Sequence, residues 1–323
     1  MSEAARRPAL IIGAAGFVGG YLAAELARAA LWDVYATKMP SETFAAPGVQ
    51  VFDLDILERE AVAALVGRLR PAVIFHLAAQ SSVAVAWKDP GLTVDVNVKG
   101  ALNVLDAVRA AGLERQTRVL LIGSSEEYGA PAADEIPVKE SKRPVPGNLY
   151  AATKAAQNEI GRIYAKAYRM DILSTRSFNH IGPGQSPIFV VADFCKQVAE
   201  IEAGLRAPLM QVGNLSAKRD FTDVRDVVRA YVLLAQKGVS GETYNVGSGS
   251  SVAIQEVLER ILALSTAQIE VRTDPARLRP VDVPEVRADI TKLREATGWT
   301  PEVPLETTLK ETLDDWRGKA QNA

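Results

Sequence analysis

Two side chains suited to proton transfer lie four residues apart in the segment NLYAATKAAQNEI. These are Tyr150 and Lys154, and the alanines around them favour a helix. Residues i and i+4 share one helical face, so the phenol and the ammonium can serve one site. A neighbouring cation lowers the pKa of a phenol, which makes it usable as an acid or base near neutral pH. The pair therefore predicts proton transfer at a carbonyl oxygen.

A third candidate follows an apolar run, RVLLIG (118–123), that reads as a strand. Ser124 and Ser125 come directly after it, where ligands bind in open parallel sheets. Either serine could hydrogen-bond the oxygen that Tyr150 protonates. Alternate residues of an extended segment point the same way, so Glu126 could face the same substrate as Ser124.

The elements that must position these residues alternate along the chain. Short apolar runs at 9–12, 33–37, 49–54, 72–79, 118–123 and 171–178 are separated by segments of helical period. This alternation predicts an α/β fold, a Rossmann-type doubly wound parallel sheet with a smaller C-terminal α/β substrate-binding lobe. We expect residues 1–178 to form the dinucleotide-binding domain, with parts of about 220–248 returning to it. Residues 179–323 should form mainly the smaller lobe, because the chain is richer in Pro and Gly from about Gly182.

A glycine-rich loop joins the first predicted strand to an alanine-rich helix in ALIIGAAGFVGGYLAAELARAA. Gly13 permits a tight turn, Gly16 lets backbone N–H groups approach a pyrophosphate, and Gly19 allows close helix–strand packing. The loop, with Phe17 and Val18 in it, is therefore predicted to bind a dinucleotide. A tight turn without a ligand is the alternative, which the strand before and the helix after disfavour.

The second and third strands end in residues that could select the cofactor. Thr37 and Lys38 stand where folds selective for NAD usually carry a carboxylate for the ribose 2′-hydroxyl. A hydroxyl with a cation suits a 2′-phosphate better, so NADP(H) is favoured and NAD(H) remains possible. Asp55 and Ile56 could contact the adenine; Asp53 is the rival, and Asp55 could instead cap the next helix.

Composition excludes several classes of partner. The 323 residues include 37 basic and 39 acidic side chains, a net charge of −2, with no block of like charge for nucleic acid or an anionic membrane. The single cysteine, Cys195, and the absence of a signal-peptide pattern indicate a cytoplasmic protein. No apolar run is long enough to cross a bilayer. His76 and His180 lack ligand spacing, so we expect no metal.

The motifs together resemble the extended short-chain dehydrogenase/reductase family that acts on nucleotide sugars. They are GAAGFVG, HLAAQSSV, NVKGALNVLDA, GSSEEYG, YAATK, STRSFNHIGPGQ, RDFTDVRDV and YNVGSG, and they cover nearly the whole chain. The resemblance implies that Ser124, Tyr150 and Lys154 are catalytic, with Lys154 also touching the nicotinamide ribose. It implies that Leu77, Ala78 and Ala79 line the nicotinamide side of the groove, and that residues 179–323 form mainly the nucleotide-sugar-binding lobe. The residues implied to contact the sugar or its GDP group are Ser81, Ser124, Glu126, Asn179, Val190, Arg219 and Arg279.

Within the family, four segments most resemble those of members that carry out one reaction: GSSEEYG, FNHIGPGQSPIFVVADF, VGNLSAKRDFTDVRDVVRAY and LRPVDVP. That reaction is NAD(P)H-dependent reduction of the C4 keto group of GDP-4-keto-6-deoxy-D-mannose to GDP-D-rhamnose. The alternative is GDP-mannose 4,6-dehydration, in which Glu126 would remove the C5 proton. A nucleotide-sugar 4-epimerase comes next, and a non-catalytic dinucleotide-binding module last.

The resemblance also implies a homodimer. Helices predicted near 92–111 and 148–168 carry apolar residues on more than one face. In this family the equivalent helices pair into a four-helix bundle between two subunits.

Overall fold

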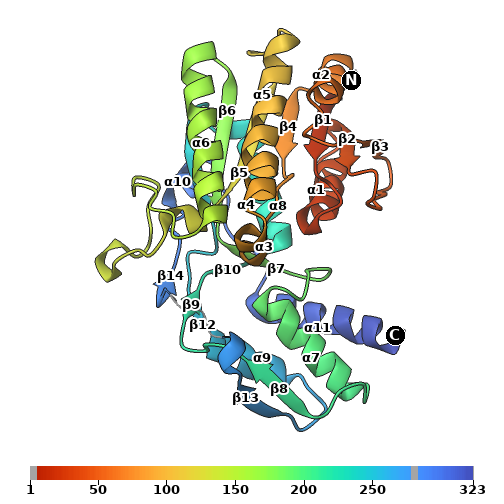
Figure 1. Ribbon diagram of the computed structural model, residues 1–323, viewed down its shortest axis with the longest axis vertical. Coiled ribbons are helices and arrows are strands. Elements are labelled where there is room, and N and C mark those ends of the chain that lie inside the picture. The colour runs from red at the N-terminus through yellow and green to blue at the C-terminus, as the bar shows by residue number, and fades with distance from the viewer. Residues whose placement is uncertain (1–5, 278–282, 323) are drawn as a thin grey trace.

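The computed structural model describes residues 6–277 and 283–322, and a seven-stranded sheet forms its main body. Every pairing in the sheet is parallel, and the strand order is β11-β6-β5-β4-β1-β2-β3 (Figure 1). The strands are β1 (Arg7–Ile12), β2 (Trp32–Lys38), β3 (Gln50–Asp53), β4 (Val73–His76), β5 (Arg118–Ser124), β6 (Asp171–Ser177) and β11 (Thr243–Val246). This sheet confirms the doubly wound α/β fold predicted from the sequence.

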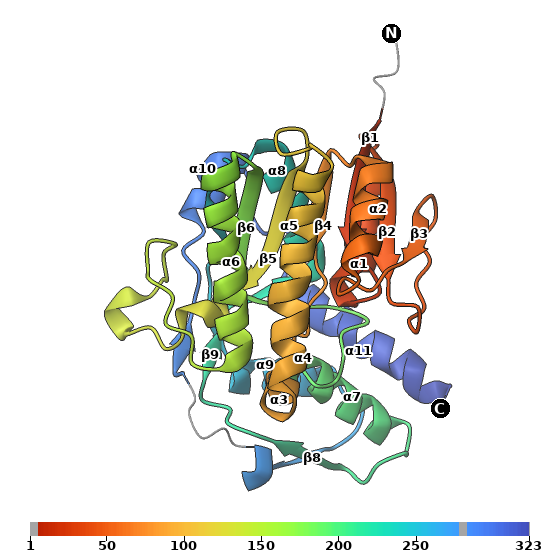
Figure 2. The ribbon, with the colours of Figure 1, turned by 45° about the horizontal axis from the view of Figure 1, so that its top comes forward.

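Helices cover both faces of the sheet. One face carries α2 (Arg59–Leu69), α5 (Gly100–Ala110) and α6 (Leu149–Tyr168), which lie across the near side in Figure 2. The other carries α1 (Phe17–Arg28), α8 (Val224–Lys237) and α10 (Thr291–Thr297). Because β1, β4 and β5 are buried on both faces, most of their residues are apolar, whereas β6 also buries polar side chains.

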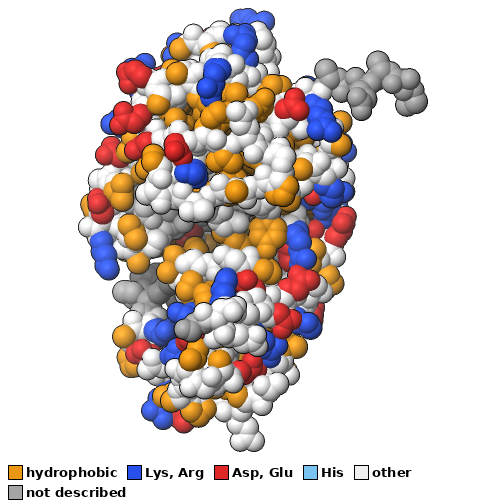
Figure 3. All heavy atoms as spheres, turned by 90° about the vertical axis from the view of Figure 1, so that its right-hand side faces the viewer, with side chains coloured by type: hydrophobic (Ala, Val, Ile, Leu, Met, Phe, Trp, Pro, Cys, Tyr) orange, Lys and Arg blue, Asp and Glu red, His pale blue; other side chains and the backbone are white. Residues whose placement is uncertain are grey.

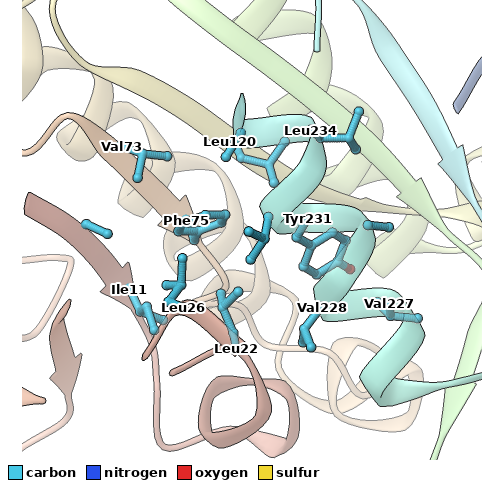
Figure 4. Packing of buried hydrophobic residues seen from close by; sticks show 14 of the residues in the cluster. Ile11, Leu22, Leu26, Val73, Phe75, Leu120, Val227, Val228, Tyr231 and Leu234 are labelled. Atoms are coloured by element: carbon cyan, nitrogen blue, oxygen red, sulfur yellow. The ribbon is translucent and has the colours of Figure 1, made fainter. Parts of the chain in front are cut away.

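Figure 4 shows the core between the sheet and helices α1 and α8. Phe75 of β4 packs with Leu22 and Leu26 of α1, while Val228 and Tyr231 reach the same cluster from α8. All of these side chains are buried. This cluster ties α8, far along the chain, to the first helix of the dinucleotide-binding body.

The direction of strand addition reverses between β1 and β4. From β1 the sheet grows through β2 and β3 on one side and through β4, β5, β6 and β11 on the other. The loops that follow β1 and β4 must therefore leave in opposite directions. They open a crevice at the carboxyl ends of these strands, the place where open α/β sheets bind ligands.

Short helical segments connect several of the main elements. They are α3 (Val83–Lys88), α4 (Pro90–Val94), a π-helix (Asp95–Lys99), and 3₁₀ helices at Ser125–Tyr128 and Ala133–Glu135. The π-helix interrupts the path from α4 into α5, and π-helical turns are frequent at functional sites.

The remaining elements form the smaller lobe seen below the sheet in Figure 1. They are β7 (Asn179–Ile181), α7 (Val190–Glu202), β8 (Leu209–Val212), β9 (Lys218–Arg219), β10 (Phe221–Asp223), β12 (Val252–Ala253), α9 (Ile254–Ala263), β13 (Glu270–Thr273), a 3₁₀ helix (Pro275–Arg277), β14 (Glu285–Val286) and α11 (Leu305–Gln321). A core of its own joins α7, α9 and α11. Within this C-terminal part of the chain, β11 and α10 belong to the main body.

The surface carries no large patch of one charge on the face shown in Figure 3, where basic and acidic side chains are interspersed. Among the described residues, no helix combines the length and apolarity that a membrane span requires.

Candidate active site

The N-terminal turn of α6 presents Tyr150. Asn148 caps this helix, because its Oδ1 accepts a hydrogen bond from the backbone N–H of Ala151 at 2.9 Å. Tyr150 therefore lies in a turn whose backbone is fixed, and Lys154 follows one turn later on the same helical face. The helix packs against β5 and β6, which brings this face to the end of β5.

Ser124 is the last residue of β5, and its side chain meets Tyr150 there. The Ser124 hydroxyl lies close enough to the Tyr150 phenol to act on its pKa, which it lowers. The Ser124 hydroxyl oxygen also accepts a hydrogen bond from the backbone N–H of Glu126 at 3.2 Å. The structure thus brings a serine from a strand end and a tyrosine from a helix start onto one point, where both can hydrogen-bond the same substrate oxygen.

Lys154 is buried and faces the sheet. Its Nζ donates to the carbonyl oxygen of Ile122 at 2.8 Å and to Oε1 of Gln157 at 3.2 Å. Burial lowers the pKa of this ammonium to about 8, and the nearby negative charge of Glu127 opposes that shift.

The pKa of Tyr150 differs in direction from the one expected from its spacing to Lys154. Sequence spacing predicted a lowered phenol pKa, but burial raises the pKa of Tyr150 and the nearby Ser124 hydroxyl only partly offsets this. The neighbouring Glu126 and Glu127 add negative charge that raises it further. Desolvation of the phenol is the largest cause of the shift, and the Lys154 ammonium is directed to the carbonyl oxygen of Ile122 instead.

The glycine loop after β1 has the shape of a pyrophosphate cradle. Gly13 adopts φ +87°, and a Cβ there would meet Cα of Ala78 at 2.6 Å. A Cβ on Gly19 would meet the carbonyl oxygen of Ala14 at 2.0 Å, whereas on Gly16 the nearest described atom is the carbonyl oxygen of Gly13 at 3.7 Å. Gly13 and Gly19 are thus required for packing, whereas a Cβ on Gly16 would make only an ordinary van der Waals contact at the start of α1.

The first turn of α1 suits an anion. No side chain in the described part of the chain caps Gly16, the N-cap residue, and this turn carries no acidic residue. Phe17 and Val18 direct their side chains into protein contacts, Phe17 stacking on His180 with a centroid distance of 6.1 Å and Val18 packing on the core. Their backbone N–H groups are left at the positive end of the helix dipole, which suits the pyrophosphate of a dinucleotide.

Thr37 and Lys38 do not share the role that their adjacency suggested. Thr37 is buried, and its Oγ1 accepts a hydrogen bond from the N–H of Gly13 at 3.2 Å. This threonine therefore shapes the glycine loop. Lys38 forms an ion pair with Asp53 across β2 and β3, Nζ to Oδ1 2.5 Å.

Asp55 and Ile56 lie after β3, at the side of the crevice expected to receive the adenine. Oδ1 of Asp55 accepts a hydrogen bond from the N–H of Leu57 at 2.9 Å, so this carboxylate shapes the turn before α2. Ile56 is buried, and its Cδ1 would lie 2.4 Å from a Cβ on Gly100. The Ile56 side chain thus belongs to the core.

The residues after β4 lie beside the glycine loop. The N–H groups of Leu77 and Ala78 both donate to the carbonyl oxygen of Ile12 at 2.9 Å. Ala78 also packs against Gly13, and Ala79 continues the same loop. These three residues therefore form the wall of the crevice on the β4 side.

Asn97, in the π-helix, is a residue of this site that sequence reasoning missed. Its Nδ2 donates to the carbonyl oxygen of Gln80 at 3.0 Å and to Oγ1 of Thr153 at 2.9 Å, and its Oδ1 accepts from the N–H of Gln80 at 2.8 Å. Asn97 is buried and ties the loop after β4 to the helix that bears Tyr150 and Lys154. The sequence signal that could have identified it is its place as the first residue of the NVKG motif.

The candidate substrate residues are spread over several elements. Ser81 is exposed after β4, Asn179 is exposed in β7, and Val190 is exposed at the start of α7. Arg219, partly buried in β9, donates from Nη1 to the carbonyl oxygen of Val283 at 2.7 Å. Glu126 is exposed and accepts a hydrogen bond from Nδ2 of Asn148 at 2.9 Å, beside Tyr150. Arg279 lies outside the described residues.

Residues 6–277 and 283–322 contain no group of three or more His, Cys, Asp or Glu side chains arranged to bind a metal ion. His76 is buried, and its burial lowers the pKa of the imidazole to about 3, so it is neutral.

Comparison with known proteins assigns this site to a family. The family model described as GDP-mannose 4,6 dehydratase matches residues 10–312. The chain belongs to the GDP-mannose 4,6-dehydratase family of extended short-chain dehydrogenases/reductases. As a member of that family it is an NAD(P)-dependent enzyme acting on nucleotide sugars.

The relatives of this chain include enzymes with different activities. GDP-6-deoxy-D-mannose reductase of Pseudomonas aeruginosa is 35% identical over 311 residues, covering 96% of this chain and 97% of that protein. The structure of RMD from Pseudomonas aeruginosa complexed with NADPH has a TM-score of 0.84 at 33% identity, covering 97% and 99% of the two chains. UDP-glucose 4-epimerase of Thermus thermophilus complexed with NAD has a TM-score of 0.85 at 29% identity, covering 96% and 99%.

Proposed function

We propose that the protein reduces the C4 keto group of GDP-4-keto-6-deoxy-D-mannose to GDP-D-rhamnose. The contact between Ser124 and Tyr150, with buried Lys154 one turn further on, carries this proposal. It supplies a proton donor and a second hydrogen-bonding group for one carbonyl oxygen, beside a loop that suits a dinucleotide. The choice of substrate is supported by the 35% identity to a GDP-6-deoxy-D-mannose reductase.

The residues of the chain supply the proton and the orientation in this mechanism. Bound NADPH would supply the hydride that C4 receives. Tyr150 gives its phenolic proton to O4, so that the carbonyl becomes a secondary alcohol. Ser124 donates a hydrogen bond to O4 as negative charge develops there, and Lys154 stabilises the phenolate left on Tyr150.

We further propose that NADPH is preferred to NADH. Lys38 lies at the end of β2, where a cation favours a ribose 2′-phosphate, and its partner Asp53 is the more exposed member of the pair. The Lys38 ammonium can therefore exchange a solvated carboxylate for the 2′-phosphate. Asp53 at the same point would allow some use of NADH.

The substrate is proposed to lie between the crevice and the lobe. The exposed residues Ser81, Asn179 and Val190 would contact the sugar of the substrate. Arg219 would bind the diphosphate, since a guanidinium pairs bidentately with phosphate oxygens. Arg279 is proposed as its companion from the sequence alone.

A homodimer is also proposed. Leu92 and Val94 of α4 and Ile163 of α6 are exposed apolar side chains on the side of the sheet that carries α5. Pairing of these helices with a second copy would remove that surface from water. Light scattering coupled to size exclusion would give about twice the 34.7 kDa chain mass if the pairing forms.

A second candidate is GDP-mannose 4,6-dehydration, favoured by the position of Glu126. This carboxylate lies close enough to Tyr150 for its charge to raise the pKa of the phenol. A base at that point could remove the C5 proton of a transient C4 ketone before water leaves from C6.

Two incubations of the purified protein separate the candidates. With GDP-4-keto-6-deoxy-D-mannose and NADPH, the proposal expects stoichiometric loss of the cofactor absorbance and a gain of two mass units on the sugar nucleotide. With GDP-mannose alone, it expects no change in mass. Loss of water from GDP-mannose without net cofactor consumption would instead establish the dehydratase.

A further inference from the structure

Glu127, next to the candidate base Glu126, is a fully buried carboxylate with three side-chain or backbone partners. Its Oε1 accepts hydrogen bonds from the backbone N–H of Ser124 at 2.9 Å and from Nδ2 of Asn158 at 2.8 Å. Its Oε2 accepts from Nε of Arg176 at 3.0 Å. A buried charge is costly unless it is paired and hydrogen-bonded, and Glu127 satisfies both conditions.

The sequence leaves a space for this carboxylate beside β5. A Cβ on Gly123 would lie 2.3 Å from Oε1 of Glu127, from Nδ2 of Asn158 and from the carbonyl oxygen of Thr175. Any other residue at position 123 would displace the carboxylate. Gly123 and Glu127 therefore form one structural unit at the strand end that bears Ser124.

Hydrogen bonds to Glu127 connect this unit to Ser124 and to α6, the helix that bears Tyr150 and Lys154. The bond to the Ser124 N–H fixes the backbone of the residue that contacts Tyr150. Asn158 lies one helical turn beyond Lys154, so the bond to Asn158 fixes α6 against β5 on that side. A single carboxylate thus sets the spacing between the strand end and the catalytic helix.

The charges around Glu127 come from three neighbouring elements. Arg176 of β6 is its hydrogen-bonded cation and also lies over the ring of Tyr128, 4.6 Å from the centroid. Lys154 of α6 is a second buried cation, whose protonated form Glu127 favours. Tyr150 of α6 is uncharged, and His76 of β4, near Lys154, is neutral. Burial raises the pKa of the Glu127 carboxyl, while Arg176 and the hydrogen bonds from Ser124 and Asn158 oppose that shift and favour the anion.

We propose that Glu127 is a positioning residue that fixes Ser124 against α6 and keeps Lys154 protonated. The proposal rests on the catalytic roles assigned above to Ser124 and Lys154, but not on which nucleotide sugar is reduced. It separates the two adjacent glutamates: Glu126 is exposed beside Tyr150, whereas Glu127 is inside the fold.

Three variants test the two parts of this role. Glu127→Gln removes the charge and keeps the length of the side chain. Glu127→Asp keeps the charge but is one methylene shorter, so it loses reach to Ser124 or Asn158. Glu127→Gln/Arg176→Met removes the unpaired guanidinium that the first variant leaves. Glu25→Gln, which breaks the Glu25–Arg28 pair on α1, is the control for loss of a Glu–Arg pair.

The first readout is the titration of Lys154 itself, followed by NMR of the protein with ¹³C-labelled lysine side chains and without substrate. The signal absent from Lys154→Met identifies the residue. In the wild type it should titrate near pH 8. In both variants that lack the Glu127 charge the midpoint should fall by about one pH unit, while Glu127→Asp and Glu25→Gln should keep it near the wild-type value.

The second readout is kcat as a function of pH. Glu127→Gln should lose activity on the alkaline side at a lower pH than the wild type, in step with the Lys154 signal. Glu127→Asp should lower kcat about 10-fold or more with an unshifted alkaline limb, because Ser124 is misplaced. If Glu127→Gln does not fold, the double variant is used in its place for both measurements. If only Glu127→Asp folds, its kcat decides whether Glu127 positions Ser124.

An unchanged Lys154 midpoint in a folded variant without the Glu127 charge overturns the electrostatic part. A wild-type kcat in Glu127→Asp overturns the positioning part. Because the titration needs no substrate, failure of the proposed reductase activity would appear separately, as a wild-type protein without turnover but with the expected Lys154 midpoint.

Discussion

Lys154 donates a hydrogen bond from its ammonium to the carbonyl oxygen of Ile122, 2.8 Å away in β5. This bond turns the cation toward the sheet and buries it, which lowers its pKa to about 8. The helix thus carries an ammonium that is only marginally protonated in the upper physiological pH range. Such a group is expected to be retained for chemistry, because it does not favour stability.

Lys154→Met is therefore expected to increase stability and abolish turnover. Methionine has a similar length without the buried charge, and the Ile122 carbonyl oxygen keeps a partner in Nε2 of Gln157, 3.2 Å away. The free energy of unfolding at pH 7 should rise by roughly 1–3 kcal/mol. Denaturant unfolding measures it, and a clear loss of stability would contradict the reasoning.

Activity and stability should respond oppositely to alkaline pH in the wild type. The pKa of Lys154 falls from its ordinary value of 10.5 to about 8 on folding. Between these values the unfolded chain binds the proton more tightly, so the contribution of this group to stability rises with pH. The protonated form is lost over the same range, so kcat should fall above about pH 8. Melting temperatures from pH 7 to 10 should show this rise in the wild type relative to Lys154→Met.

Tyr150→Phe should reduce kcat by about a thousandfold or more, because the only change is loss of the proton donor. Binding of NADPH, measured by fluorescence titration, should stay within about threefold of the wild-type affinity. Tyr35→Phe is the control, since Tyr35 of β2 stacks on Phe52 of β3, and β1 and β4 separate these strands from β5. Substantial turnover in Tyr150→Phe would remove the phenol from the mechanism.

Two alanine substitutions in the glycine loop should separate packing from ligand binding. In Gly19→Ala the new Cβ would lie 2.0 Å from the Ala14 carbonyl oxygen, so the variant should lose several kcal/mol of stability. In Gly16→Ala the nearest described atom is at 3.7 Å, so the fold should be kept. Its affinity for NADPH should nevertheless fall at least tenfold, because the methyl group enters the space next to the helix N-terminus. Equal affinity in Gly16→Ala and the wild type would place the pyrophosphate elsewhere.

The ion pair between Lys38 and Asp53 should tune the cofactor preference. Asp53→Asn removes the carboxylate that competes for the Lys38 ammonium, so the ratio of kcat/KM for NADPH to that for NADH should rise. Lys38→Ala should lower the same ratio about tenfold or more. Glu42→Gln, whose carboxylate accepts a hydrogen bond from the N–H of Met39 nearby, controls for a general change of charge at this edge. If neither substitution changes this ratio, the ribose 2′ position of the cofactor lies away from β2.

The sequence by itself determined the parts of the protein that depend on local spacing. Alternating apolar runs predicted the parallel sheet, which is confirmed, because the strands are buried on both faces and the helices amphipathic. The four-residue interval set Tyr150 and Lys154 on one helical face, and the glycine spacing indicated the loop before α1. The roles of these residues stay predictions.

Only the tertiary structure decided contacts between distant segments. It turned Thr37 toward the glycine loop, directed Lys154 to Ile122, and placed Asn97 and Glu127 as buried ties beneath the candidate site. It also placed α10 on the main body, whereas the return of the segment that contains β11 had been expected from the sequence. A side chain's protonation and partners depend on what burial removes from water and on which strand arrives beside it. The residues adjacent to a side chain in the sequence therefore determine neither its protonation nor its hydrogen-bond partners.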